Sequence, residues 1–193
     1  MAKRQSSLVH PERQPEVFIA LYRGINVGGK NSVKMPILRS IHEQMGHLRV
    51  RSYVQSGNIV FESAADANEI AHTLVNKFSV ALEFSVKVMV VSARRWQTVI
   101  QNNPYAAAAA NLPQTVHVGI CGGKPDAESL QKLLIKVGRN EEYVIVNDVI
   151  YLHSPDGLGT SKFAAGMEKA IGTTMTARNW RTVSALQEMA SET

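Results

Sequence analysis

The sequence predicts an α+β fold of two ferredoxin-like units packed together. The first observation is the order of strand-like and helix-like segments, β-α-β-β-α-β with a trailing helix. This order occurs in each half of the 193 residues and is typical of the ferredoxin-like unit. The second is a local match between residues 53–61 and 143–151, at an offset of 90 residues (143 − 53), which indicates internal duplication.

In the first half, residues 17–22 are a near-continuous apolar run, as expected of a strand buried on both faces. A glycine-rich loop follows, and Pro36 suits the first turn of a helix that Gly46 ends. Residues 50–55 and 59–62 form a predicted hairpin around a turn at 56–58, and Asp66 can cap the next helix. A strand at 86–91 and a short helix after Ser92 complete the unit.

The second half repeats this order. A strand at 115–121 precedes a helix that opens at Pro125 and Asp126. A hairpin at 142–146 and 149–153, a helix closed by Gly172, a short strand near 174–176 and a last helix follow. We therefore divide the chain into a disordered basic tail (1–15), a first unit (16–103), a five-alanine connector (104–113) and a second unit (114–193).

Composition and charge exclude several classes of protein. With 45% apolar and 19% charged residues, the chain is unlike a disordered, collagenous or coiled-coil protein. It has no apolar run near the roughly 20 residues that a membrane helix needs. The lone cysteine, Cys121, forms no intrachain disulfide, which favours a reducing cytoplasm. The net charge of +5 permits a phosphate-bearing partner without requiring one.

The predicted strand order, 4-1-3-2 and antiparallel, brings loops together. The first and second strands then leave the sheet at the same end, so the loop 23–34 should meet the turn 55–58. Glycines allow this loop to approach a ligand closely, and successive amides form an anion-binding concavity. We expect an anion to bind Arg23, Lys30 and the amides of Gly28 and Gly29. Side chains at the turn and loop would orient it: Asn26, Gln55 and Asn58, next to Ser56 and Gly57.

The same loop contains a partial phosphate-binding P-loop pattern. Residues 24–30 fit G-x-x-x-x-G-K, but Asn31 stands where a magnesium-binding serine or threonine is needed. A P-loop also needs a parallel sheet. Nucleotide hydrolysis through this loop is therefore not favoured.

A second cluster is expected at one end of the second sheet, where residues 154–162 and 176–182 leave their strands. Thr160 or Ser161 can cap a helix whose N-terminal amides attract anions. Lys162, Arg178 and Arg181 add positive charge, and Asn179 adds a polar side chain. These residues would form a second anion subsite or face the first across the groove between the units. The plainer interpretation makes Asn179 or Thr182 a helix cap.

Several segments of the chain resemble a known family. They are RGINVGG at 23–29, YVQSGNIVF at 53–61, the run at 151–162 and TARNWRT at 176–182. Over about residues 16–190, the chain resembles the bacterial family named domain of unknown function 1697. The resemblance implies an α+β fold of two ferredoxin-like parts and no established activity.

We expect a cytoplasmic protein that binds an anionic, phosphate-bearing small molecule or nucleotide in glycine-rich loops, with no cofactor or metal ion. The six histidines show no zinc-site spacing, and no nucleophile with a neighbouring base is visible. Three alternatives stay open: a nucleic-acid-binding protein, favoured by the pI of ≈ 9.4; an enzyme acting on a phosphorylated substrate; and a protein interaction module. The ligand's identity and the oligomeric state are left open.

Overall fold

The structure, a computed structural model, describes residues 13–26, 31–82, 84–137 and 140–192. Residues 1–12 of the predicted tail, and Gly28, Gly29 and Lys30 of the predicted site, lie outside the described residues. The first half contains β1 (Glu16–Arg23), α1 (Met35–Gln44), β2 (Leu48–Tyr53), β3 (Asn58–Ser63), α2 (Ala67–Ala81), β4 (Lys87–Ser92) and α3 (Ala93–Gln101). After α4 (Ala106–Asn111) come β5 (Val116–Cys121), α5 (Ala127–Val137), β6 (Glu142–Val146), β7 (Val149–His153), a 3-10 turn (Leu158–Thr160), α6 (Lys162–Ala170), β8 (Met175–Asn179) and α7 (Trp180–Ser191).

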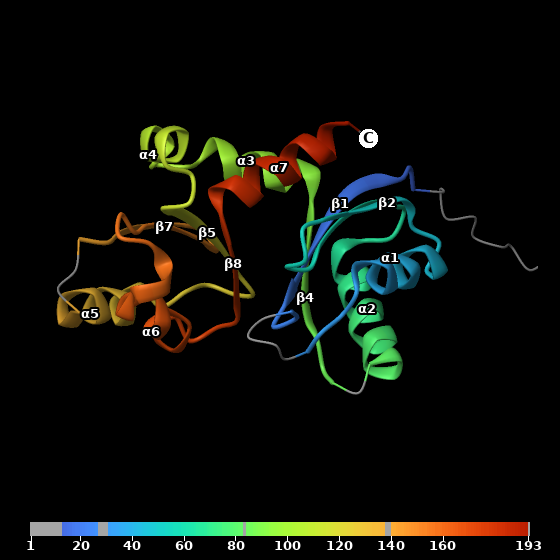
Figure 1. Cartoon of the computed structure of the whole chain (residues 1–193), viewed down its shortest axis with the longest axis horizontal. Helices are drawn as coiled ribbons and strands as arrows, with labels where there is room; N and C mark the ends of the chain where they lie inside the picture. The colour runs from blue at the N-terminus through green and yellow to red at the C-terminus, as the bar shows by residue number, and fades with distance from the viewer. Residues whose placement is uncertain (1–12, 27–30, 83, 138–139, 193) are drawn as a thin grey trace, which may run out of the picture.

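The strands form two four-stranded antiparallel sheets with equivalent orders, β2-β3-β1-β4 and β6-β7-β5-β8. Each order is the predicted one, with the first strand of the half between its third and fourth strands. Strands β4 and β8 are edge strands. In Figure 1 the two sheets stand side by side, and α3 and α7 lie above their junction. The α+β class and the strand order are therefore confirmed.

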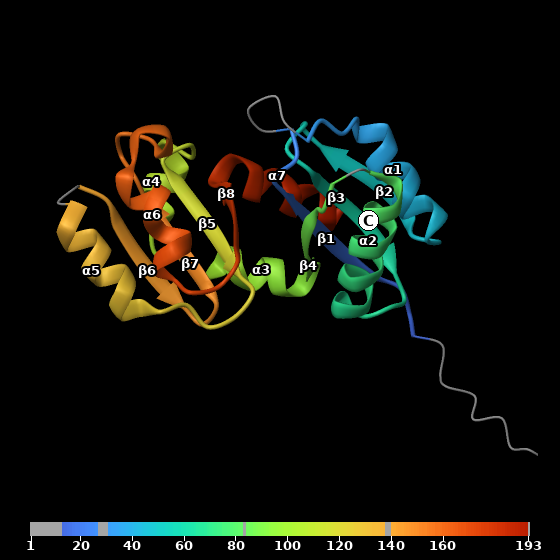
Figure 2. The same cartoon turned by 90° about the horizontal axis from the view of Figure 1, so that it is seen from below.

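Each sheet has an outer face covered by its own helices. On β1, every second residue, such as Ala20 and Tyr22, packs against α1 and α2. On the second sheet, Cys121 and Ile150 pack against α5 and α6. Figure 2 shows these helix pairs at opposite ends of the molecule. The alternation of buried positions follows from the two-residue period of a strand.

The inner faces share a single core. Leu21 of the first sheet and Val118 of the second belong to the same apolar cluster, which also contains Trp96 of α3 and Val183 of α7. The Trp96 indole donates a hydrogen bond to the Val183 carbonyl at 3.2 Å. The trailing helix of each half therefore closes the junction between the halves, and neither sheet has an inner core of its own.

Helix starts follow the predicted capping residues. The Asp66 carboxylate accepts hydrogen bonds from the Asn68 and Glu69 amides at 2.9 Å, and Ser92 caps α3 in the same way. Within the predicted connector, the alanines form the helix α4. Alanine has the highest helix propensity, and the buried Ala109 anchors this short helix to the protein.

Candidate binding site at the junction of the sheets

The first predicted loop and turn meet as the topology requires. The Tyr22 amide donates to the Gly57 carbonyl at 2.8 Å, and the Asn26 side chain donates to the Gln55 carbonyl at 2.8 Å. Gln55 and Ser56 are exposed at the tip of the turn. The exit of β1 and the β2–β3 hairpin therefore form one surface.

Two predicted ligand-orienting residues brace this surface. Asn26 also donates to the Val33 carbonyl at 2.9 Å and accepts from the Val33 amide at 2.8 Å. Asn58 is fully buried and donates to the Tyr53 carbonyl and the Ser56 hydroxyl at 3.2 and 2.9 Å. Because these bonds use both amide side chains, Asn26 and Asn58 hold the loops in place.

Gly57 is required by space and by backbone conformation. Its φ is +72°, in the region that favours glycine. A Cβ at this position would lie 2.6 Å from Ile25 Cδ1 and 2.7 Å from Tyr22 Cβ. No larger residue fits without moving β1 or its loop. Gly57 therefore shapes the turn.

Arg178 crosses from the second sheet to the first. Its Nε donates to Asn58 Oδ1 at 2.6 Å, and its Nη2 donates to the carbonyls of Tyr22 and Ser56 at 2.7 and 3.1 Å. Among the described residues, no carboxylate pairs with this guanidinium. Burial lowers the pKa of Arg178 to about 10, so the side chain remains positive at neutral pH. Arg178 therefore faces the predicted first site, formed by the loop 23–34 and the turn 55–58. This is one of the two arrangements that the sequence predicts for Arg178.

The rest of the second cluster does not share one pocket with Arg178. Arg178 lies opposite Val118, which faces the inner core, whereas α6 covers the other face of that sheet. Ser161 caps α6 by accepting from the Ala164 amide at 2.8 Å, and Lys162 begins this helix. Strand alternation therefore separates Arg178 from both, which corrects the expectation that all three form one subsite.

The remaining two residues of that cluster lie at the start of α7. Asn179 caps α7 by accepting from the Thr182 amide at 3.0 Å, as in the plainer interpretation. The exposed Arg181 lines a shallow groove with Tyr53 and Trp180. Both segments of the cluster leave the same end of the sheet, but the inner face carries Arg178 and the outer face is covered by the helix that Ser161 caps.

Two of the ion pairs that connect the halves involve Arg23 and Arg95, and neither was predicted. The Arg23 guanidinium donates two hydrogen bonds to the Glu168 carboxylate of α6. Arg95 of α3 pairs with Asp148 in the β6–β7 turn. Their partners are 145 and 53 residues apart, and helix or turn positions of this kind carry no sequence signal for a distant partner.

A groove of ≈ 460 Å³ lies along the edge strand β4, between the two halves. Arg23, Lys87 and Arg95 line it from three different elements, and Asp148 is the one carboxylate among its described lining residues. Arg23 and Lys87 are direct cross-strand partners in the β1–β4 register. Like charges placed directly opposite each other are destabilising. The groove therefore holds cations in an arrangement that an anion would stabilise.

The groove also has an apolar wall, formed by Val88, Met89 and Ile120. Cys121 lines the groove but is buried. Burial, and to a smaller extent the nearby Asp148 carboxylate, raise the pKa of its thiol to about 11. The thiol is thus protonated at neutral pH and is a poor nucleophile. The lining suits binding better than covalent chemistry.

The histidines offer no metal centre in the described part of the chain. His42 and His47, which the sequence places on no common helix face, are in contact because His47 follows the end of α1. Tyr22 Oη lies 2.7 Å from His42 Nε2, and the two Nδ1 atoms lie 2.9 Å apart. Burial lowers the pKa of His42 to about 3 and that of His47 to about 4. Both rings are therefore neutral and belong to the core.

Comparison with known proteins agrees with this architecture. Over 92% of its length, the chain superposes on 99% of the solved structure of a conserved bacterial protein, SP0830 from Streptococcus pneumoniae, with a TM-score of 0.65 and 22% identity. At this identity the likeness concerns the fold alone. No curated protein matches the chain. Every helix in the described ranges is too short or too polar to cross a membrane. The protein family of unknown function DUF1697 matches residues 16–151, which is most of the chain, and the protein therefore belongs to that family.

Proposed function

We propose that the protein binds a phosphate-bearing small molecule or nucleotide in the groove along β4. The observation that carries this proposal is the cross-strand pair of cations, Arg23 and Lys87, at the end of a groove that Arg95 also lines. A phosphate between Arg23 and Lys87 would replace like-charge repulsion with charge-assisted hydrogen bonds. Arg23 would exchange the Glu168 carboxylate for the ligand.

The charge of the junction supports an anionic ligand. Four cations, Arg23, Lys87, Arg95 and Arg178, stand against two carboxylates, Glu168 and Asp148, which leaves an excess of two positive charges. Arg178 donates to the carbonyl of Tyr22, the residue before Arg23. A concave site lined by one sign of charge raises the local concentration of oppositely charged ligands.

The shape of the groove favours a ligand larger than phosphate. Its volume of ≈ 460 Å³ lies in the usual range for small-molecule sites, which is about 300–1,000 Å³. The apolar wall at Val88, Met89 and Ile120 suits the base or another apolar part of such a ligand. Anion binding by Lys30 and by the amides of Gly28 and Gly29 remains a prediction from the sequence.

Binding of inorganic phosphate, AMP and ATP, measured by thermal shift and calorimetry, tests the proposal. We expect a nucleotide to bind more tightly than phosphate, and Lys87→Gln to weaken nucleotide binding about tenfold, since a charge-assisted bond contributes about 1.5–3 kcal/mol. Lys77→Gln removes a lysine from the exposed side of α2 and should leave binding unchanged. If Arg23→Gln and Lys87→Gln both bind every hit like the unaltered protein, the groove is not the site.

Salt dependence separates this function from nucleic-acid binding. A protein that contacts several phosphates of a nucleic acid loses affinity with a log–log slope of about −0.7 to −0.9 per contact. A single phosphate group in the groove should give a shallow slope. A steep slope with oligonucleotides, unchanged by Lys87→Gln, would favour the nucleic-acid alternative.

A second candidate function is recognition of an extended acidic peptide. Residues 85–91 line the groove without interruption, and β4 is an edge strand. The edge of a sheet can pair with an added strand. Protection of the β4 amides from hydrogen exchange by an acidic peptide, with no response to nucleotides, would favour this interaction-module function.

We also infer that the two sheet-and-helix units are ferredoxin-like duplicates in a cytoplasmic protein, with the boundaries 16–103, 104–113 and 114–193. The shared strand order and the 90-residue offset support the duplication. Because the inner core joins Trp96 of the first unit to Val183 of the second, residues 114–193 expressed alone should lack a cooperative unfolding transition. A cooperative transition of that fragment would show that the unit is an independent domain.

A further inference from the structure

The second sheet contains a separate cavity on the face opposite to the junction. It measures ≈ 110 Å³ and lies between β5, β7, β8 and α6. None of its described lining residues lines the groove along β4. Its described walls are apolar side chains, and His117 is the one polar side chain among the described residues that line it. The cavity therefore has an apolar body and a single polar point.

His117 is more than nine-tenths buried, with 8% of its surface exposed. Its Nδ1 is buried and has no hydrogen-bond partner among the described residues. Buried side-chain polar atoms nearly always have a partner, and each exception calls for an explanation. Burial lowers the pKa of His117, and this effect outweighs a smaller opposing one from the Thr115 backbone. At neutral pH the ring is neutral, and one of its nitrogens carries a free lone pair.

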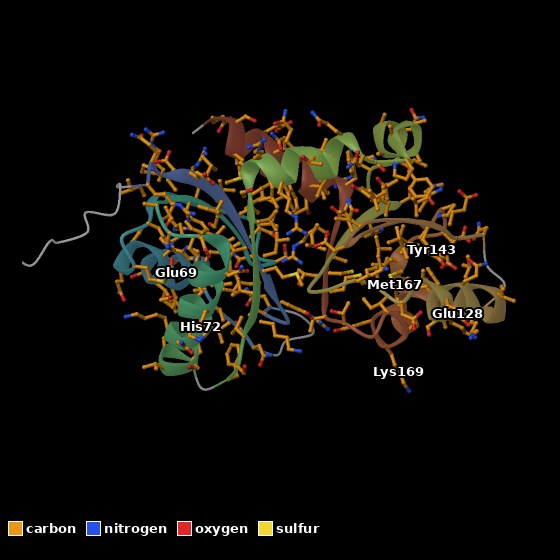
Figure 3. All side chains as sticks on the ribbon, turned by 180° about the vertical axis from the view of Figure 1, so that it is seen from behind. Glu69, His72, Glu128, Tyr143, Met167 and Lys169 are labelled. Atoms are coloured by element: carbon orange, nitrogen blue, oxygen red, sulfur yellow. The ribbon has the colours of Figure 1, made fainter. Side chains whose placement is uncertain are left out.

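The walls of the cavity are adaptable. Met167 points from α6 toward the sheet and is buried, whereas Lys169 of the same helix extends into solvent (Figure 3). Met175 of β8 lies over Gly119, where any Cβ would collide with the thioether. Methionine is flexible and polarisable, so it can repack around a guest. Two methionines, one of which occupies the space beside Gly119, therefore line the cavity together with His117.

We propose that this cavity binds a small neutral molecule with an apolar body and one N–H or O–H group that donates to His117 Nδ1. The cavity volume limits the size of the guest. At the packing density of protein interiors, ≈ 110 Å³ holds about 80 Å³ of guest atoms, roughly the size of benzene. A purely apolar guest would leave Nδ1 unpaired, so the site selects for the donor group.

Pyrrole and furan are a matched pair of probes, because both are five-membered rings and only pyrrole has an N–H donor. We expect pyrrole to bind about tenfold more tightly than furan, since furan leaves the buried nitrogen unpaired. In ¹⁵N NMR spectra, pyrrole should shift the His117 Nδ1 resonance from that of a free acceptor. His117→Phe should bind pyrrole and furan equally.

Cavity-filling variants test the location. Ala164→Leu, which places a larger side chain in the cavity wall, should abolish binding of both probes. The matched control is Ala165→Leu on the exposed side of the same helix, which should bind like the unaltered protein. Equal affinity of pyrrole and furan, a proton on Nδ1 in the NMR spectrum, or no binding of either probe at millimolar concentration would each overturn the proposal. The comparison of pyrrole with furan and the NMR measurement on Nδ1 use only the unaltered protein, so they test the proposal even if a variant fails to fold.

Discussion

Replacement of Arg178 with methionine tests whether this side chain holds the two halves together. Arg178→Met leaves Asn58 Oδ1 and the Tyr22 carbonyl without their donors at 2.6 and 2.7 Å. Each buried acceptor left unpaired costs about 1–3 kcal/mol, or about 4 kcal/mol for the two. Part of this loss is offset because methionine removes the burial of a charge. The lowering of the pKa of Arg178 from 12.5 to about 10 corresponds to roughly 3 kcal/mol. Loss of the Ser56 contact at 3.1 Å adds to the cost, and we expect a net loss of about 2 kcal/mol.

Equilibrium unfolding in urea, followed by tryptophan fluorescence, measures this effect. The two tryptophans, Trp96 and Trp180, both belong to or pack against the shared inner core, so their fluorescence reports on the junction. The control is Arg181→Met, three residues further along the chain, where the exposed side chain should contribute less than about 0.5 kcal/mol. Equal free energies of unfolding for Arg178→Met and Arg181→Met would show that Arg178 does not hold the two halves together.

Three further outcomes follow from the described contacts. Because burial keeps His42 and His47 neutral, with pKa values of about 3 and 4 against 6.5 when unfolded, the unfolded state binds more protons below pH 6.5. The unfolding free energy should fall by about 2 kcal/mol through His42 alone between pH 7.5 and 5, and His42→Gln should remove that part of the pH dependence measured by urea unfolding; a flat profile for the unaltered protein would contradict it. Val54 is exposed at a φ of +48°, so Val54→Gly should raise the free energy of unfolding by about 1 kcal/mol; a loss of stability would show that the turn is not strained. Glu168→Gln frees Arg23 from a competing carboxylate and should tighten nucleotide binding about fivefold in calorimetry, since exposed ion pairs contribute up to about 1 kcal/mol; unchanged affinity would show that Glu168 does not compete.

Much of the fold could be predicted because local patterns determine it. Alternating apolar residues indicated the strands. Asp66, Ser92 and one of the two candidates Thr160 and Ser161, namely Ser161, cap helices as predicted. The meeting of the loop after β1 with the β2–β3 turn followed from strand order alone. The sequence also placed Asn179 correctly as a cap under the plainer interpretation. In each case the physical cause acts within a few residues or within one sheet.

The candidate site was less predictable because its contacts join different elements. Nothing near Arg23 indicates that Glu168 is its partner, and nothing near Lys87 marks it as the cross-strand neighbour of Arg23 until the register of β4 is known. Asn26 and Asn58 looked like ligand-binding side chains, but the tertiary structure uses their hydrogen bonds internally. A polar residue in a loop has the same local signal in either role.

The sequence by itself determined the two sheets, their strand order and the end of the first sheet where loops converge, since strand periodicity, capping and chain connectivity are local properties. Only the tertiary structure decided on which face of its sheet each of these side chains lies. Arg178 and Ser161 leave the same sheet, yet the two-residue period of a strand sends Arg178 to the junction while the chain carries Ser161 to the opposite face. The packing of α3 and α7 into one shared core then decided how the halves meet, and with it the groove in which Arg23, Lys87 and Arg95 face one ligand-sized space.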